Sequence, residues 1–230
     1  MIAGGVTVPG TYFAGTPATL TEIRQVAATL RGPVTVLGGP VTFGYSPGGG
    51  GEAAVRQAIS GFDHLLEGGD VPAALASLLA GGAAPEGTLS YPDFSRWLIA
   101  GSGIITEHPP RFPWLICEIE TARGCARAVT GGCSFCTEPF YGQPQYRPAA
   151  DVHAEIAALA RHGAVHFRLG RQPDILAYGT KGEREYPAPP DATALETLFA
   201  GIREVAPNLK TLHIDNVNPR HHRPQPGRCP

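Results

Sequence analysis

The fold of this chain is decided by the stretch WLICEIE at residues 114–120, together with the helices and strands on its C-terminal side. Alternate positions of this stretch are apolar and share one face of an extended chain: Leu115, Cys117 and Ile119. The opposite face carries Ile116, Glu118 and Glu120. Alternation with a period of two is typical of a β-strand that buries one face, so we expect a strand here.

Two more strands with this alternation come later in the chain, and a helix precedes each of them. Apolar residues recur at helical spacing over residues 150–161 and 192–205, and strands are expected at residues 165–169 and 211–217. Strand, helix and strand in this order predict parallel strands joined by crossover helices. Because a long loop at residues 121–147 comes after the first strand, the pattern predicts the beginning of a β/α barrel.

The second face of these strands is polar, which allows two interpretations. The later strands contribute four polar side chains to this face: His166, Arg168, His213 and Asp215. In a barrel this face would line the lumen, where it would suit a charged or polar ligand. Alternatively, the side chains pair with one another, for example Glu118 or Glu120 with Arg168. The sequence leaves both interpretations open.

The N-terminal part of the chain shows a separate alternation of helices and strands. Helices are expected at residues 20–30, 52–60 and 71–79, and strands at residues 34–37 and 62–66. The first helix presents one apolar face: Leu20, Ile23, Val26, Ala27 and Leu30. Repeated βαβ units of this kind predict a Rossmann-like sheet, which is incomplete here.

The predicted fold class is therefore α/β, with a partial Rossmann-like domain at residues 1–84 followed by a partial β/α barrel at residues 114–218. The intervening residues 85–113 are rich in Pro and Gly, so we expect a linker there. Residues 219–230 contain four prolines and no periodicity, which predicts a disordered tail.

The composition indicates a globular protein without a strong charge bias. The chain has 230 residues, of which 43% are hydrophobic and 17% charged, and its net charge is -2. This balance gives no electrostatic reason to expect nucleic acid or an anionic membrane as a partner. No apolar run approaches the roughly 18 residues of a membrane span, and the N-terminus lacks the features of a signal peptide. We therefore expect a cytoplasmic protein with reduced thiols.

Three of the five cysteines lie close together in the loop at residues 121–147: Cys125, Cys133 and Cys136. In a chain with reduced thiols, such a cluster indicates metal ligands. Three thiolates can hold a metal centre and leave one coordination position open for chemistry. A structural zinc site would require a fourth ligand, for which the candidates are Cys117, His108 and His153. Cys117 lies on the apolar face of its strand, so we expect it in the core.

Two segments around these cysteines resemble the cluster loop of radical S-adenosylmethionine (radical SAM) enzymes: EIETARGC at residues 118–125 and GCSFC at residues 132–136. Residues 5–15, 167–173 and 213–219 are similar to a mainly archaeal, uncharacterised group of radical SAM iron–sulfur oxidoreductases with a cobalamin-binding-like domain in front. The resemblance covers nearly the whole chain up to about Pro219. The cysteine loop with its glycines is the specific part.

The resemblance implies a [4Fe–4S] cluster on Cys125, Cys133 and Cys136, whose fourth iron would bind the amino and carboxylate groups of SAM. An electron from a donor such as flavodoxin or ferredoxin would cleave SAM. The 5′-deoxyadenosyl radical so formed would abstract hydrogen from a substrate that the sequence does not identify. Phe135 matches the family's aromatic position beside the SAM adenine, and the alternative for it is plain packing within the loop. The resemblance assigns no catalytic residue.

The family's Gly-Gly-Glu segment after the second strand is replaced here by LGRQP at residues 169–173. In the family this segment holds the amino group of SAM. We expect Gly170 to permit close approach of the backbone and Gln172 to accept from the ammonium group. Arg171 could instead meet a carboxylate.

The chain also departs from the family pattern in its cysteine spacing and its number of strands. The common spacing is Cys-x3-Cys-x2-Cys, whereas residues 126–132 separate the first two cysteines here. The family barrel has more strands than the three expected in this chain, so the resemblance implies a truncated member, which could be an inactive fragment. The segment Asp-x-His-x-x-Gly of classical cobalamin domains is absent, so cobalamin binding is not expected.

Two other functions compete with the radical SAM interpretation. The first is a non-catalytic iron–sulfur or zinc module with a structural or interaction role. The second is a thiol redox protein that uses Cys133 and Cys136. This second alternative is weak, because such a motif normally begins a helix inside a compact thioredoxin-like unit.

Overall fold

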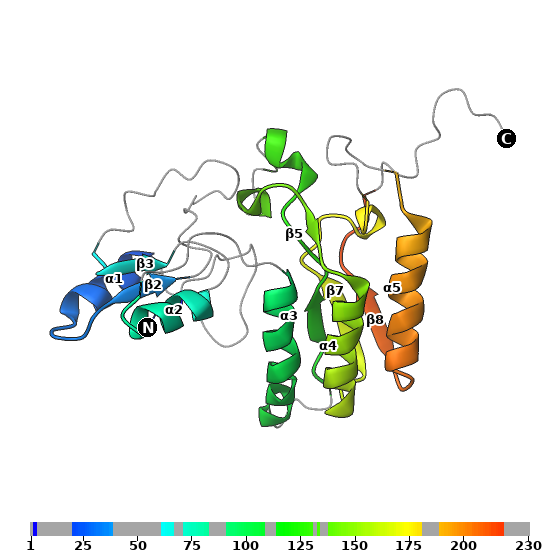
Figure 1. Cartoon of the computed structure of the whole chain (residues 1–230), viewed down its shortest axis with the longest axis horizontal. Helices are drawn as coiled ribbons and strands as arrows, with labels where there is room; N and C mark the ends of the chain where they lie inside the picture. The colour runs from blue at the N-terminus through cyan, green and yellow to red at the C-terminus, as the bar shows by residue number, and fades with distance from the viewer. Residues whose placement is uncertain are drawn as a thin grey trace. The chain divides into compact units, whose positions relative to one another are not determined.

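The structure is a computed structural model that describes residues 2–3, 20–38, 61–66, 71–82, 91–108, 114–130, 133, 138–180 and 189–218. The chain divides into two compact units: Met1–Leu89 with Cys133–Thr137, and Ser90–Gly132 with Glu138–Pro230. Each unit contains helices and a parallel β-sheet (Figure 1). The mixed α/β class predicted from the sequence is therefore confirmed.

The first unit contains a three-stranded parallel sheet in the order β1-β2-β3. Its strands are β1 (Ile2–Ala3), β2 (Val36–Gly38) and β3 (His64–Leu66). Helix α1 (Leu20–Thr29) precedes β2, and helix α2 (Val71–Leu79) follows β3. Both helices lie where the apolar periodicity predicts them.

Strands β2 and β3 begin two residues later than predicted, and side chains take part in the hydrogen bonds just before them. Asp63 Oδ2 accepts hydrogen bonds from the Thr35 backbone N–H at 2.7 Å and from the Thr35 hydroxyl at 2.8 Å. The Asp63 N–H is shared between Thr35 Oγ1 and the Thr35 carbonyl, both at 3.0 Å. An aspartate that binds neighbouring backbone groups in this way competes with a regular ladder.

The predicted apolar face of α1 is only partly buried. Ala27 is buried, whereas Val26 is 53% exposed and Leu30 is 44% exposed. The helix predicted at residues 52–60 and the disordered tail predicted at residues 219–230 lie outside the described residues.

The second unit contains a three-stranded parallel sheet in the order β4-β7-β8. Its strands are β4 (Cys117–Glu120), β7 (His166–Gly170) and β8 (Thr211–Ile214). Helix α4 (Ala149–Arg161) precedes β7, and helix α5 (Ala192–Val205) precedes β8. These elements confirm the predicted alternation of strands and helices, and α5 has its predicted bounds.

Helices α4 and α5 pack on the same face of this sheet (Figure 1). The centre of the core consists of apolar side chains from both layers with 0% exposure: Ile119, Phe167, Leu169, Val152, Ile156, Leu198 and Ile202. Burial of each such side chain contributes about 1.5–3 kcal/mol. The alternate strand positions face the other side, so the predicted separation of apolar and polar faces is confirmed.

Part of the segment predicted as a linker is helical. Within residues 85–113, the structure forms α3 (Tyr91–Ala100) and a 3-10 helix, η3 (Gly101–Glu107). Tyr91 and Ile105 are buried, so this segment packs into the second unit. The Pro and Gly content of the flanking residues suggested a linker and hid the helical spacing between them.

The loop at residues 121–147, called the cysteine loop below, is closed at its base by a short ladder. Strands β5 (Ala122–Arg123) and β6 (Gln145–Tyr146) pair antiparallel. The Arg147 N–H extends this pairing with a hydrogen bond of 2.9 Å to the Thr121 carbonyl. The first and last residues of the loop therefore lie together.

In the described part of the chain, three further 3-10 helices lie near the carboxyl ends of the strands. Two are in the cysteine loop, η4 (Ala126–Thr130) and η5 (Glu138–Tyr141), and η6 (Ile175–Ala177) follows β7. Asp174 caps η6 by accepting a hydrogen bond from the Leu176 N–H at 3.2 Å. None of the helices in the described part of the chain is long and apolar enough to cross a membrane.

Candidate functional site: the cysteine loop

The start of the cysteine loop is a tight turn that only glycine can occupy. Gly124 has a φ of +80°, in the left-handed region. A Cβ at this position would lie 2.5 Å from the Gln143 carbonyl oxygen and 2.6 Å from that of Gly142. The Cys125 N–H donates to the same Gly142 oxygen at 2.9 Å. Close backbone contact therefore fixes Cys125 directly after the β5–β6 ladder.

Two backbone amides bind Cys125, one at its sulfur and one at its carbonyl oxygen. Its sulfur accepts a hydrogen bond from the Arg127 N–H at 3.4 Å, and its carbonyl accepts one from Ala128 at 2.9 Å. The side chain is 6% exposed. Amides directed at cysteine sulfur stabilise a thiolate and tune the potential of iron–sulfur clusters, so Cys125 is suited to hold a metal.

The other two predicted ligands are less fully described. Cys133 is partly exposed and belongs with the first unit, and Cys136 lies outside the described residues, as does Phe135. Among the residues that the structure describes, no three His, Cys, Asp or Glu side chains gather closely enough to hold a metal ion. The set of three cysteine ligands therefore stays a prediction.

The candidates for a fourth zinc ligand are placed elsewhere in the second unit. Cys117 is in the core cluster, as predicted, and burial, together with the charge of Glu155, raises the pKa of its thiol. His153 Nε2 lies 3.0 Å from the Leu198 carbonyl oxygen and hydrogen bonds to it. His108 is exposed and follows η3.

Gly170 and Gln172, predicted to lie beside SAM, are both buried but have different neighbours. Gly170 is buried, and a Cβ there would meet the side chain of Glu118. Gln172 is 3% exposed, and its Nε2 donates to the Leu169 carbonyl at 3.2 Å. Its Oε1 is buried without a hydrogen-bond partner among the described residues. An ammonium group could reach this oxygen only after the covering residues move.

Gln172 also connects the segments after two strands. Its carbonyl accepts a hydrogen bond of 3.0 Å from Asn216 Nδ2, and the Asn216 carbonyl accepts one of 3.0 Å from the Ile175 N–H. These bonds join the carboxyl ends of β7 and β8, so the close packing around Gln172 is part of the sheet edge.

Of the two interpretations of the polar face, mutual pairing is present in the structure. Arg168 forms a charged hydrogen bond with Asp215, and its Nη1 lies 3.7 Å from Glu118 Oε2. The bond to Asp215 raises the pKa of Arg168. The arginine on β7 thus lies between two carboxylates, Glu118 on β4 and Asp215 directly after β8. Glu120, the second predicted partner of Arg168, pairs with other arginines.

Four charged residues at the carboxyl ends of β4 and β7 form a set that we call the ionic ring: Arg123, Glu120, Arg171 and Glu138. Arg123 Nε lies 2.6 Å from Glu120 Oε1, as an ion pair without the alignment of a hydrogen bond. Arg171 Nε lies 3.5 Å from Glu120 Oε2, and Arg171 Nη2 donates to Glu138 Oε1 at 3.1 Å. A carboxylate partner was predicted for Arg171, and the chain itself supplies two, Glu120 and Glu138.

The ionic ring is partly withdrawn from water. The Glu120 side chain is 9% exposed and the Glu138 side chain is 20% exposed. Burial raises the pKa of Glu138, and the nearby Arg171 opposes that rise. The Tyr91 hydroxyl donates to Glu120 Oε1 at 3.2 Å, and the Arg123 guanidinium lies 4.4 Å from the centre of the Phe94 ring. Helix α3 therefore contacts the ionic ring through the aromatic side chains of Tyr91 and Phe94.

Arg147, at the end of the cysteine loop, is fully buried. Its guanidinium forms an ion pair with Glu155 and donates to Ser95 Oγ at 3.1 Å and to the Asp151 carbonyl at 3.1 Å. Its own carbonyl accepts a hydrogen bond of 2.6 Å from the Tyr178 hydroxyl. This arginine joins the loop to α3 and α4, and no local sequence signal indicated its role.

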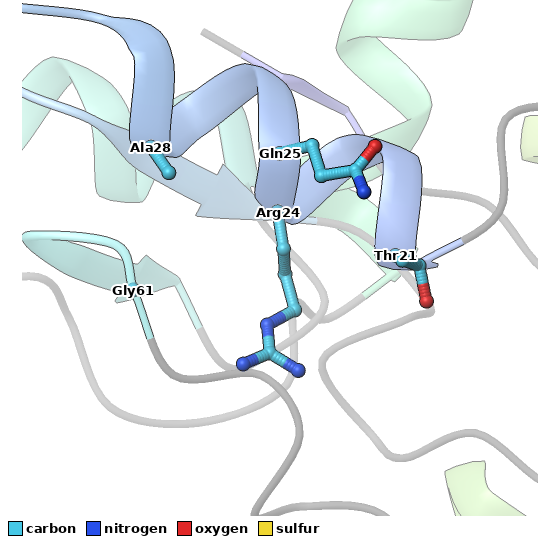
Figure 2. A pocket seen from close by; sticks show the side chains of 5 residues that line it. All are labelled: Thr21, Arg24, Gln25, Ala28 and Gly61. Atoms are coloured by element: carbon cyan, nitrogen blue, oxygen red, sulfur yellow. The ribbon is translucent and has the colours of Figure 1, made fainter.

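A pocket on the first unit offers a different kind of surface. Four residues spaced along one side of α1, together with Gly61, line it: Thr21, Arg24, Gln25 and Ala28 (Figure 2). All of these residues are exposed, and none was predicted as a site residue. The described residues that line the pocket include no cysteine and no member of the ionic ring, so we regard the cysteine loop as the better candidate site.

No family model matches the chain. An uncharacterized protein of Methanocaldococcus jannaschii is 39% identical over 227 residues, which cover 94% of this chain and 40% of the relative. An uncharacterized protein of Archaeoglobus fulgidus is 34% identical over 222 residues, which cover 96% of this chain and 37% of the relative.

A third relative carries a functional name. The tRNA-2-methylthio-N(6)-dimethylallyladenosine synthase of Sorangium cellulosum is 30% identical over 184 residues, which cover 74% of this chain and 35% of the relative. The chain thus spans about two fifths, or less, of the length of the curated relatives it matches.

Proposed function

We propose that this chain carries the cluster-binding segment of a radical SAM protein, in which Cys125, Cys133 and Cys136 hold a [4Fe–4S] cluster beside SAM. The environment of Cys125 is the observation that carries this proposal. Its sulfur receives a backbone amide, and a glycine turn with close backbone contact holds it at the carboxyl end of a parallel sheet. A cysteine in such a turn fits a cluster better than a core position.

The arrangement of the second unit supports the same class. Strands β4, β7 and β8 pair in chain order, and α4 and α5 lie on one face of their sheet. This is the arrangement of consecutive units in a β/α barrel, in which functional residues follow the carboxyl ends of the strands. The cysteine loop follows β4, and the Gly170–Gln172 segment follows β7. We therefore propose a partial barrel in this chain, preceded by a partial Rossmann-like domain.

The third relative supports the proposed chemistry. Its name describes an adenosine in which a methylthio group stands at carbon 2, where adenosine has hydrogen. Replacing that hydrogen requires breaking an unactivated C–H bond, which is the kind of step that the proposed chemistry performs. The match covers too little of the relative to transfer its tRNA substrate, and the net charge of -2 does not favour nucleic acid.

Cys125, Cys133 and Cys136 would hold such a cluster, and together with SAM it would supply one-electron chemistry for abstracting hydrogen from a substrate. The residues of this chain would orient the bound groups and exclude water. We propose that Phe135 contacts the adenine and that Gly170 and Gln172 lie beside the methionine end of SAM. The electron donor would be a protein such as flavodoxin or ferredoxin in the cytoplasm.

The test is anaerobic reconstitution of the chain with iron and sulfide. We expect a brown protein with about four irons and four sulfides per chain, and a reduced EPR signal that changes when SAM is added. The variant Cys125→Ala should lose the signal, whereas Cys229→Ser, outside the cysteine loop, should retain it. A colourless protein with stoichiometric zinc would contradict the proposal and favour the non-catalytic zinc module.

Formation of 5′-deoxyadenosine under dithionite then separates an active enzyme from a non-catalytic iron–sulfur module. A reconstituted chain that binds SAM and forms no 5′-deoxyadenosine would retain the cluster assignment and contradict the radical step.

A further inference from the structure

The two ends of the cysteine-bearing segment are joined through one carboxylate. Glu138 follows Cys136 by two positions, and Gly124 immediately precedes Cys125. The Gly124 N–H donates to Glu138 Oε2 at 3.2 Å, while Arg171 Nη2 donates to Glu138 Oε1 at 3.1 Å. The carboxylate thus connects both ends of the segment to the residue that follows β7.

We propose that Glu138 is a positioning residue of the cysteine loop: held by Arg171, it fixes both ends of the cysteine segment before any metal binds. Each oxygen of the carboxylate accepts from a different donor. An ionised carboxylate is the side chain that can do this, since a glutamine would direct an NH2 group at one of two donors. The proposal therefore rests on the two acceptor oxygens of one side chain and the donors that they meet.

Arg171 is adapted to this contact at a conformational cost. Its φ is 53°, which makes it the one non-glycine residue with a positive φ in the described part of the chain. A bulky residue in the left-handed region is strained and persists where its surroundings hold it. Here Glu120 and Glu138 hold the guanidinium from two sides. Glycine would adopt this φ without strain, but it would lack the guanidinium that binds the two carboxylates. The need for that guanidinium explains why a strained arginine stands at position 171.

The contacts close into a circuit around the start of the loop. Glu138 binds Arg171, Arg171 pairs with Glu120, and Glu120 pairs with Arg123, whose chain neighbour Gly124 binds Glu138. Opening the loop at one point therefore disturbs the whole ionic ring. A loop ordered in this way loses less conformational freedom when a metal binds, so its affinity for the metal is higher.

Alkylation of the metal-free chain under native conditions tests the proposal. Iodoacetamide labelling is followed by peptide mass spectrometry at Cys125, in the loop, and at Cys117, in the core. We expect Glu138→Gln to accelerate labelling of Cys125 by about tenfold, the effect of losing one hydrogen bond to a charged group, without accelerating labelling of Cys117. Comparing the limiting rates at alkaline pH removes the influence of the lost charge on thiol ionisation.

A matched control makes the same chemical change on an exposed surface. Glu196→Gln on α5 should leave both rates unchanged. Equal acceleration at Cys125 and Cys117 would show that Glu138 acts on the stability of the whole unit, and unchanged labelling of Cys125 would show that it does not hold the loop. Either outcome overturns the proposal.

A second experiment links the positioning role to the proposed function, on which this part rests. After reconstitution, Glu138→Gln should release its iron to a chelator about tenfold faster than the unmodified chain. If the unmodified chain takes up no iron, the proposed function fails, while the alkylation experiment still decides the role of Glu138. If the variant releases iron at the unmodified rate, Glu138 does not position the metal ligands.

Discussion

The two parallel sheets of this chain differ in where charged side chains lie. In the first unit, Asp63 lies just before β3 and binds Thr35 at the surface. In the second unit, Glu120, Glu138 and Arg147 lie around the carboxyl ends of the strands and are buried or partly buried. An exposed charge can organise a turn at little cost, whereas buried charges must overcome desolvation. Their concentration at one sheet edge makes that edge the better candidate for a functional site.

Removing the buried arginine should have the largest effect. In Arg147→Met, Glu155 loses its ion-pair partner in a buried position, so we expect a loss of about 3–5 kcal/mol in the unfolding free energy of the second unit. Burial already raises the pKa of Glu155. Chemical denaturation, followed through the far-ultraviolet signal, measures the change.

A double variant separates the missing pair from the missing packing. Arg147→Met with Glu155→Gln removes the unpaired charge and should recover a large part of the loss. If Arg147→Met lowers the unfolding free energy by less than about 1 kcal/mol, the buried pair contributes no more than an exposed ion pair does. The contrast between the two units in buried charge would then have no energetic basis.

A substitution in the turn before Cys125 should have an intermediate effect on the unfolding free energy. Gly124→Ala introduces a Cβ that meets two carbonyl oxygens, and it forces a left-handed φ on alanine. We expect a loss of about 2–4 kcal/mol and a chain that no longer assembles a cluster. Thermal unfolding and iron content check the two expectations separately.

Gly142→Ala provides a matched control for this variant. Gly142 has a φ of +81°, similar to the +80° of Gly124, but a Cβ there would meet nothing within 4 Å. It should cost only the conformational part, about 1–2 kcal/mol. Equal losses in both variants would mean that the close carbonyl contacts do not matter.

Removing the exposed charge of Asp63 in the first unit should have the smallest effect on the unfolding free energy. The hydrogen bonds from the Thr35 backbone and hydroxyl lower the pKa of Asp63 below its ordinary value of 3.8. Its ionised form therefore stabilises the folded state above about pH 4, and this contribution is lost as the pH falls through the lowered pKa. Unfolding of Asp63→Asn and of the unmodified chain should differ slightly at neutral pH and converge in acid. Curves that stay parallel down to pH 2 would contradict this origin.

Local patterns allowed much of the fold to be predicted. Helices α2 and α5 have their predicted bounds, because apolar periodicity and flanking residues act within one segment. Helix α3 was missed, because the Pro and Gly content around it outweighed the short run Tyr91–Ala100. The hydrogen bonds just before β2 involve Asp63, which lies 28 positions away from Thr35 and was therefore not visible in the strand itself.

The candidate site, too, could be predicted only in part from the sequence. The cysteines and Gly124 stand out from spacing and residue type, so the sequence alone indicated a metal-binding loop. The ionic ring joins residues that are 33 positions apart, such as Glu138 and Arg171, and its members look like ordinary surface charges in the sequence. Only the return of the chain through α4 and β7 brings them together. The strained backbone of Arg171 likewise has no sequence signature, because such conformations normally favour glycine.

The ladder between β5 and β6 has a consequence for how this loop can vary among related chains. Because the ladder ties residues 122–123 to residues 145–146, the length of chain between them does not set the positions of β4 and α4, and we call this stretch the cassette. Lengthening a closed loop costs little, since the entropy of closure grows slowly with its length. Insertions inside the cassette can therefore accumulate without shifting β4 or α4. The seven residues 126–132 that separate Cys125 from Cys133 lie wholly within it, so a wider cysteine spacing is compatible with an unchanged sheet.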